Sequence, residues 1–167
     1  MEMIVLSFSL GALAAIPASV FESFGALGVY AAGVREISML TVILAVIVAP
    51  VAEEALKPLG MYIIHREERR PLRLKDWAIL GLIAGLGFKL LEDALYVFLY
   101  FNMTYGADGM LAGALIRVHF PVHLLASLVA GFGIGLWHQT HRIRYFALML
   151  SIAIAIHAAF NLSVSII

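Results

Sequence analysis

The apolar positions of this chain form long continuous stretches. A helix needs about 20 mostly apolar residues to cross the hydrocarbon core of a bilayer. Such stretches predict five membrane-spanning helices, at about 3–21, 38–64, 77–101, 110–137 and 145–166. The intervening segment Glu22–Glu36 is rich in Gly and Ala and fits a loop, an interfacial helix or part of a bent span. We therefore expect an all-α, polytopic membrane protein, a helix bundle with one domain over residues 1–167.

Composition narrows the class of protein. Hydrophobic residues make up 63% of the 167 positions and charged residues 13%, whereas soluble domains are about 45–50% apolar and about 25% charged. The formal net charge is zero, so no basic excess indicates nucleic acid as a partner. The chain has no cysteine, which excludes thiol catalysis and thiolate metal sites. The expected surroundings are the lipid bilayer of the cell membrane.

The charges between the stretches predict an orientation. Five basic residues lie between the second and third stretches and two, Arg142 and Arg144, between the fourth and fifth. The connection 102–109 carries no base and one acid, Asp108. Because basic loops stay on the cytoplasmic side, we expect the N-terminus in the cytoplasm and the C-terminus outside.

Polar and ionisable side chains interrupt the apolar stretches. Such groups are costly within a membrane and mark functional sites by default. They are Glu53, Glu54 and Lys57 in the second stretch, Lys89, Glu92 and Asp93 in the third, Arg117, His119 and His123 in the fourth, and His157 and Asn161 in the fifth.

Four of these groups share a depth. At 1.5 Å per residue, Glu54, Glu92, His123 and His157 lie about 16–24 Å from the cytoplasmic ends of their helices. Scattered structural charges have no reason to coincide in depth. The coincidence therefore predicts one buried polar site near the middle of the membrane.

Prolines accompany the site residues. Pro50 and Pro58 bracket the two glutamates, and Pro121 is close to His123. Proline in a spanning helix frees backbone carbonyls, which must find partners within the protein or in a wet cavity. Kinks at these positions would open a water-filled chamber around the carboxylates.

Structural interpretations of single residues stay open. Lys57 could form an ion pair with either glutamate, Lys89 could neutralise Glu92, and a lone histidine in a membrane helix often bonds a backbone carbonyl. Arg117 lies roughly 120° around the helix from His123 and fits a different partner or the outer headgroups. A structural interpretation does not account for the whole group, because the polar residues of each helix would need a separate explanation.

The residue types suit hydrolysis of a peptide bond, which needs water, a base and a group that holds the oxyanion. Buried carboxylates can act as bases and histidines can protonate a leaving amine. Glutamate and histidine are also zinc ligands. The candidate ligands are Glu54, Glu92, His123 and His157, and a water-only mechanism stays open. Two rival functions are a mid-membrane metal-ion or proton transporter, since such groups also suit ion relays, and a scaffold that uses them for helix association.

Four ordered blocks between Ala49 and Asn161 resemble the PrsW family of intramembrane proteases and, more remotely, the CAAX-protease and bacteriocin-processing family. The blocks are Glu53-Glu54-x-x-Lys57, Gly87-Phe88-x3-Glu92-x3-Tyr96, Arg117-x5-His123 with Pro121 inside it, and His157-x3-Asn161. Each block falls in its own predicted span. The chain departs from the family in being short and in having Asp93 where relatives have Asn.

The resemblance implies an endopeptidase that cuts membrane-anchored proteins, including anti-sigma factors. It implies that Glu53 and Glu54 are essential and that one of them, Glu53 in the remote relatives, activates water. It assigns the remaining residues to the same site: Glu92, His123 and His157 complete it, Asn161 stabilises the oxyanion or orients His157, Lys57 tunes the glutamates, and Tyr96 and Arg117 support them.

Overall fold

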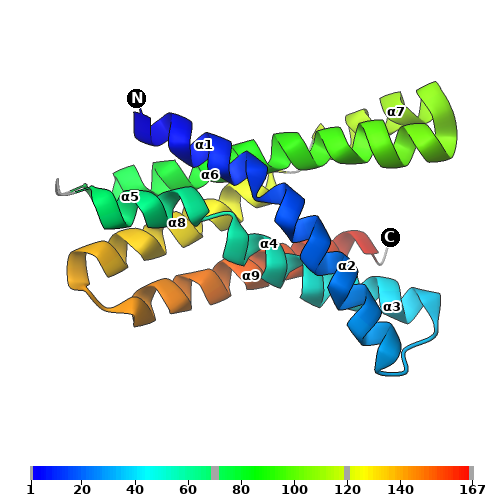
Figure 1. Ribbon diagram of the computed structural model, residues 1–167, viewed down its shortest axis with the longest axis horizontal. Helices are drawn as coiled ribbons and strands as arrows, with labels where there is room; N and C mark the ends of the chain where they lie inside the picture. The colour runs from blue at the N-terminus through cyan, green and yellow to red at the C-terminus, as the bar shows by residue number, and fades with distance from the viewer. Residues whose placement is uncertain (1, 69–71, 119–120, 166–167) are drawn as a thin grey trace.

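The computed structural model describes residues 2–68, 72–118 and 121–165, and every regular element within these ranges is a helix. Most helices run along the long axis of the molecule, and the first two cross them diagonally (Figure 1). Together with the apolar stretches below, this confirms an all-α polytopic membrane protein.

Four stretches are long and apolar enough to cross a membrane: Glu2–Ala31, Ile37–Glu67, Val122–Thr140 and Ile143–Val164. The predicted span 77–101 is not among these four, and it lies in a further long helix that carries the charged residues Lys89, Glu92 and Asp93. This helix nevertheless packs between the first helix and the helix that begins at Val122.

The first stretch consists of α1 (Glu2–Leu13) and α2 (Ala15–Ala31), which join at Ala14. Pro17 follows the junction and has no N–H for the preceding turn, which explains a bend here. The ambiguous segment after residue 21 is therefore mainly helical and continues a bent span. Only residues 32–36 link it to the next helix.

The second stretch contains α3 (Ile37–Ile43), the π-helix η1 (Leu44–Val48), α4 (Ala49–Leu56) and α5 (Leu59–Glu67). Pro58 lies between α4 and α5, outside both helices. A π-helical turn widens the backbone and is often found at functional sites. Here it directly precedes the helix that carries the two glutamates.

The next helices are α6 (Leu74–Leu95), the π-helix η2 (Tyr96–Phe101) and α7 (Asn102–Val118). The chain reverses at Gly106, where φ is 70°, so that α7 packs back against η2. The predicted connection 102–109 is thus mostly helical. The reversal needs a positive φ, which glycine adopts without strain.

The predicted continuous span 110–137 is wrong. Helix α7 ends at Val118 and α8 (Val122–Thr140) begins after Pro121, which is not helical. Proline disfavours a helical conformation of the residue before it and offers no N–H to the preceding turn. Pro121 therefore starts a new helix.

The last hairpin joins α8 to α9 (Ile143–Ser165) through His141, which is left-handed with φ 56°. At the same end of the molecule, Arg73 and Asp76 cap α6. The Arg73 backbone N–H donates to Asp76 Oδ2 over 3.0 Å, and its guanidinium donates to both carboxylate oxygens. These bonds hold the pKa of the Asp76 carboxyl below its usual range.

Glycines bring α6 and α8 into backbone contact. A Cβ at Gly81 would collide with the Ser127 carbonyl, one at Gly85 with the His123 carbonyl, and one at Gly131 with Trp77. Small residues allow membrane helices to approach this closely. The Gly85 contact places His123 against the helix that carries Glu92.

The connections divide between two ends (Figure 1). The chain start, the beginning of α6 and the α8–α9 turn lie at one end, which we call the basic end because Arg73, Lys75 and Arg142 lie there. The link between α2 and α3, the turn at Gly106 and the end of α9 lie at the opposite end.

Candidate active site

Helix α4 supplies the centre of the site. Glu53, Glu54 and Lys57 lie within slightly more than one turn, so their side chains project into the same region of the bundle. Glu53 is 4% exposed, and Glu54 and Lys57 are fully buried. Three ionisable groups with so little solvent require close partners.

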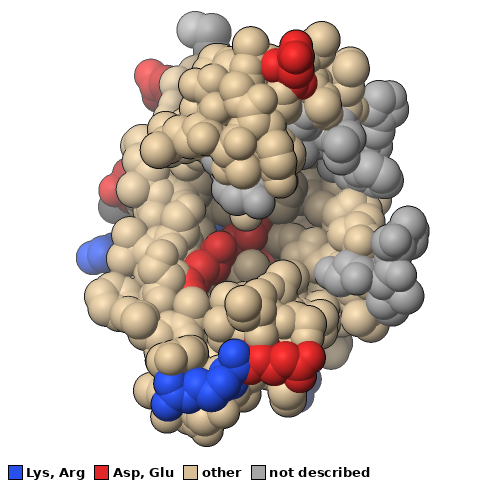
Figure 2. Space-filling model, turned by 90° about the vertical axis from the view of Figure 1, so that its right-hand side faces the viewer, with Lys and Arg blue, Asp and Glu red and all other residues tan. Residues whose placement is uncertain are grey.

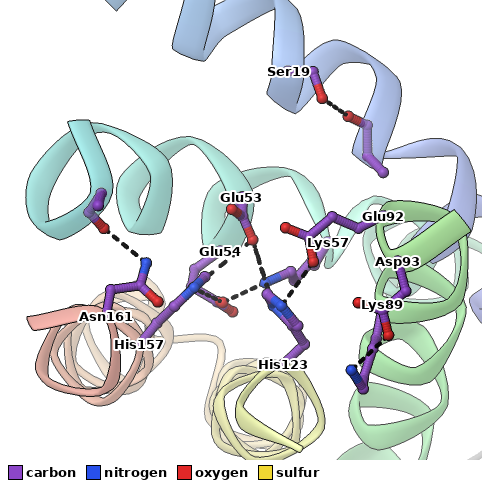
Figure 3. A network of polar contacts seen from close by, with 12 residues as sticks. Ser19, Glu53, Glu54, Lys57, Lys89, Glu92, Asp93, His123, His157 and Asn161 are labelled. Atoms are coloured by element: carbon purple, nitrogen blue, oxygen red, sulfur yellow. Dashed lines mark hydrogen bonds and ion pairs between the residues drawn. The ribbon is translucent and has the colours of Figure 1, made fainter. Parts of the chain in front are cut away.

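Lys57 links these acids to a second helix (Figure 3). Its Nζ lies 3.0 Å from Glu53 Oε2, 2.6 Å from Glu54 Oε1 and 2.8 Å from His123 Nδ1 of α8. An ammonium has three N–H donors and no acceptor. The three donors therefore match three acceptors, and Nδ1 of His123 must accept.

That contact decides the tautomer of His123. With Nδ1 accepting from Lys57, the neutral ring carries its proton on Nε2. His123 Nε2 lies 2.9 Å from Glu92 Oε2 of α6, so the nitrogen that carries the proton faces that carboxylate. The predicted residues Lys57, His123 and Glu92 thus form a continuous chain of polar contacts across three helices.

His157 joins the site from α9. Its Nδ1 lies 2.9 Å from Glu54 Oε1 and 3.8 Å from Glu53 Oε2. Its ring meets that of His123 edge to face, with centroids 4.9 Å apart. The structure thus brings Glu53, Glu54, Glu92, His123 and His157 together from four helices.

The other three predicted residues have different positions. Asn161 Nδ2 donates to the backbone oxygen of Ala45 in η1 over 2.7 Å (Figure 3). Tyr96 begins η2 and lines the cavity described next. The side chain of Arg117 lies outside the described part of the chain.

A cavity of about 510 Å³ reaches the site. Glu53, Glu92, His123 and His157 line it, whereas Glu54 does not. Figure 2 shows a deep hollow with acidic residues at its floor, viewed from the end opposite the basic end. Water can therefore approach Glu53, while Glu54 lies behind it.

Sequence reasoning missed one acid. Glu22 of α2 lines the same cavity as Glu53 and Glu92. The predicted first span ends at Phe21, which places Glu22 outside the membrane. The signal was available: an isolated acid follows an unbroken apolar stretch and precedes another helical one.

Asp93 pairs with Lys89. Lys89 Nζ lies 2.6 Å from Asp93 Oδ2, and both residues line the cavity. They lie four residues apart on α6, so the pair forms on one helix face. Lys89 is thus bonded to Asp93, and Glu92 contacts His123.

The described residues include one group able to share a metal ion: Glu53, Glu54, His123 and His157. Each offers a ligand atom, these atoms lie within 4.8 Å of one another, and all four residues are buried. The predicted set had Glu92 in place of Glu53. In the structure Glu92 contacts His123 from the far side of the ring, where it can orient a ligand.

Comparison with known proteins agrees with this geometry. A model of the PrsW family intramembrane metalloproteases matches residues 1–167. The chain belongs to the PrsW family. No curated protein and no solved structure gives a significant match.

Membership in the PrsW family makes this chain an intramembrane protease, with membrane proteins as substrates and the bilayer as its surroundings. The apolar helices agree with integration into a membrane. Family membership favours a protease over the transporter and scaffold interpretations.

Proposed function

We propose that this PrsW-family protease cuts membrane-anchored proteins with Glu53 as the base that activates water. The difference between the two glutamates carries this proposal. Glu53 lines the cavity, whereas Glu54 is fully buried and its Oε1 contacts both Lys57 and His157. Glu54 therefore positions its neighbours, and Glu53 meets the water.

Glu53 both accepts the proton from water and returns it to the leaving amine. Its carboxylate takes a proton from water as the water oxygen bonds to the scissile carbonyl carbon. When the carbon–nitrogen bond breaks, the same carboxyl returns the proton to the leaving amine. Lys57, 3.0 Å from Glu53 Oε2, balances the carboxylate charge before the transfer.

The oxyanion forms beside the histidines. His123 lines the cavity with a proton on Nε2, and Glu92 holds that tautomer. A preorganised N–H is more effective in such a dry site than in water, because the local dielectric is low. We assign His123 to the developing oxyanion, to which its Nε2–H would turn from the Glu92 carboxylate, with His157 as its buried neighbour.

The donor set fits a zinc ion in type and spacing. Glu53, Glu54, His123 and His157 offer carboxylate and imidazole ligand atoms within 4.8 Å of one another. Glu54, His123 and His157 would hold the zinc, which would leave a position for water beside Glu53 and would supply Lewis-acid polarisation and a more acidic water. The Lys57 ammonium contacts three of these residues, so it and a metal ion are alternative occupants of the space.

The substrate class follows from the family and the cavity. We propose anti-sigma-factor-like, membrane-anchored substrates on the PrsW resemblance.

By the positive-inside rule we place the basic end in the cytoplasm. The N-terminus then lies inside, and the C-terminus and the cavity mouth lie on the outer side. The whole chain forms one membrane-embedded domain.

The central test compares Glu53→Gln with Glu54→Gln in proteoliposomes that contain a membrane-anchored reporter. We expect Glu53→Gln to lose about 10²–10⁴-fold in kcat, and Glu54→Gln to lose less. His65→Gln, at the basic end, is the matched control. Equal cleavage by Glu53→Gln and the parent would refute the assignment, and a larger loss from Glu54→Gln would reverse it.

The orientation has its own test, made simple by the absence of cysteine. Ala32→Cys lies in the link between α2 and α3, and Thr140→Cys lies at the basic end. In intact cells, an impermeant maleimide should label the first variant only. Labelling of Thr140→Cys alone would invert the proposed topology.

A further inference from the structure

The π-helix η1 leaves one backbone carbonyl without a backbone donor. The Ala49 N–H donates to Leu44 O, five residues back, as a π-helix requires. In this register the next carbonyl, Ala45 O, would accept from residue 50. Residue 50 is proline and has no N–H.

A regular α-helical register offers no alternative. There, Ala45 O would accept from the N–H of Ala49, which already bonds Leu44 O. A carbonyl without a donor costs about 1–3 kcal/mol when it is buried. Asn161 Nδ2 of α9 meets this oxygen over 2.7 Å.

We propose that Asn161 is a positioning residue that holds the glutamate helix in place through the carbonyl left open by Pro50. Asn161 and His157 lie one turn apart on α9. The first bonds η1 at Ala45, and the second contacts α4 at Glu54. Two polar contacts from one face of α9 therefore hold both sides of the π-to-α junction.

This role differs from that of an oxyanion donor. The bond to Ala45 directs the Asn161 amide nitrogen toward the backbone of η1 (Figure 3). Asn161 therefore affects the reaction indirectly, through the positions of Glu53 and Glu54. The inference rests on the proposed function, because those glutamates carry the chemistry. Its structural core, the coupling between Asn161 and Pro50, is measurable without any cleavage.

The test is a double-mutant cycle. Asn161→Ala is made in the parent chain and in a Pro50→Ala chain, where residue 50 regains an N–H for Ala45 O. In the parent we expect Asn161→Ala to lower kcat by about tenfold with KM unchanged, and Tm in detergent by about 2–4 °C or more. In the Pro50→Ala chain both effects should be at least about threefold smaller.

A control and a substitute variant keep the cycle decisive. Ser151→Ala removes a side chain-to-carbonyl bond on the same helix, from Ser151 to Ala147, and should change nothing in either chain. If Asn161→Ala does not accumulate in the membrane, Asn161→Asp replaces it, because a carboxylate of the same shape has no N–H to donate.

The outcomes separate the two hypotheses. Equal losses of kcat and Tm in both chains would overturn the positioning role and favour an oxyanion donor. If the effect of Asn161→Ala on Tm depends on residue 50 but the parent chain cleaves no reporter, the Pro50–Asn161 coupling stands and the proposed function is refuted.

Discussion

Two pairs of histidines lie close together in the described part of the chain, and one of these pairs belongs to the candidate site. At the basic end, His65 and His138 approach with their Nδ1 atoms 3.1 Å apart. His65 stacks on Trp137 with ring centroids 4.2 Å apart, and Trp77 lies 5.0 Å from the His138 ring. The surroundings of this pair are aromatic.

The second pair, His123 and His157, lies at a similar separation but in different chemistry. Each of its rings contacts a carboxylate, and a cavity reaches both. The comparison teaches that proximity of imidazoles does not make a site. A site also requires acids that orient the rings and a cavity that admits water and substrate.

The largest expected difference is in cleavage, between variants that remove one histidine from each pair. His123→Ala loses the ring that links Lys57 to Glu92, so we expect cleavage to fall by about 10²-fold or more. His138→Ala should stay within about threefold of the parent, because it removes contacts with His65 and Trp77, which do not line the cavity. Reporter cleavage per folded molecule measures both, and a comparable loss from His138→Ala would contradict the distinction.

Zinc affinity should distinguish Lys57, which contacts the candidate ligands, from Lys89, which lines the cavity. Lys57→Met removes the ammonium that contacts Glu53, Glu54 and His123, so zinc should bind about tenfold tighter or more. Lys89→Met removes the partner of Asp93 and should change affinity little. Protein stripped with a chelator and titrated with Zn²⁺ gives both values. Zinc binding no tighter in Lys57→Met than in the parent would show that the ion and the ammonium do not compete.

Two glycines of the α6–α8 contact test whether the site depends on local packing. Gly85→Leu and Gly131→Leu both force the backbones apart, and each should destabilise the protein by about 1–3 kcal/mol or more. Only Gly85 touches the His123 carbonyl, so only its variant should also lose cleavage per folded molecule. Detergent unfolding curves and cleavage assays of the folded fraction measure the two effects. Equal activity losses would mean that the whole interface, and not its site end, controls His123.

The smallest effect concerns the cap of α6 at the basic end. The Arg73 bonds lower the pKa of Asp76, so its carboxylate stabilises the fold above the unfolded pKa. That contribution disappears as the pH falls through the lower folded pKa. Asp76→Asn should therefore lower Tm slightly at neutral pH and not at a pH below both values. A Tm difference that persists in acid would point to a cause other than this ion pair.

Depth along the predicted helices indicates that Glu54, Glu92, His123 and His157 lie together, because charges buried in hydrocarbon need partners. In the structure these residues do meet. Two features escaped prediction for physical reasons. Glu22 was missed because the end of an apolar stretch does not reveal how far a helix continues. The α7–α8 break was missed because the apolar stretch continues through Pro121, and a proline within such a stretch can either kink the helix or end it.

The sequence by itself determined that this chain is helical, that it lies in a membrane and which polar residues are buried within its helices, because hydrocarbon tolerates few other arrangements. Tertiary structure alone decided which glutamate faces the cavity, which atoms Lys57 contacts and what Asn161 bonds. These depend on helix rotation and on a π-helical register, where small changes in packing alter which side chain points inward.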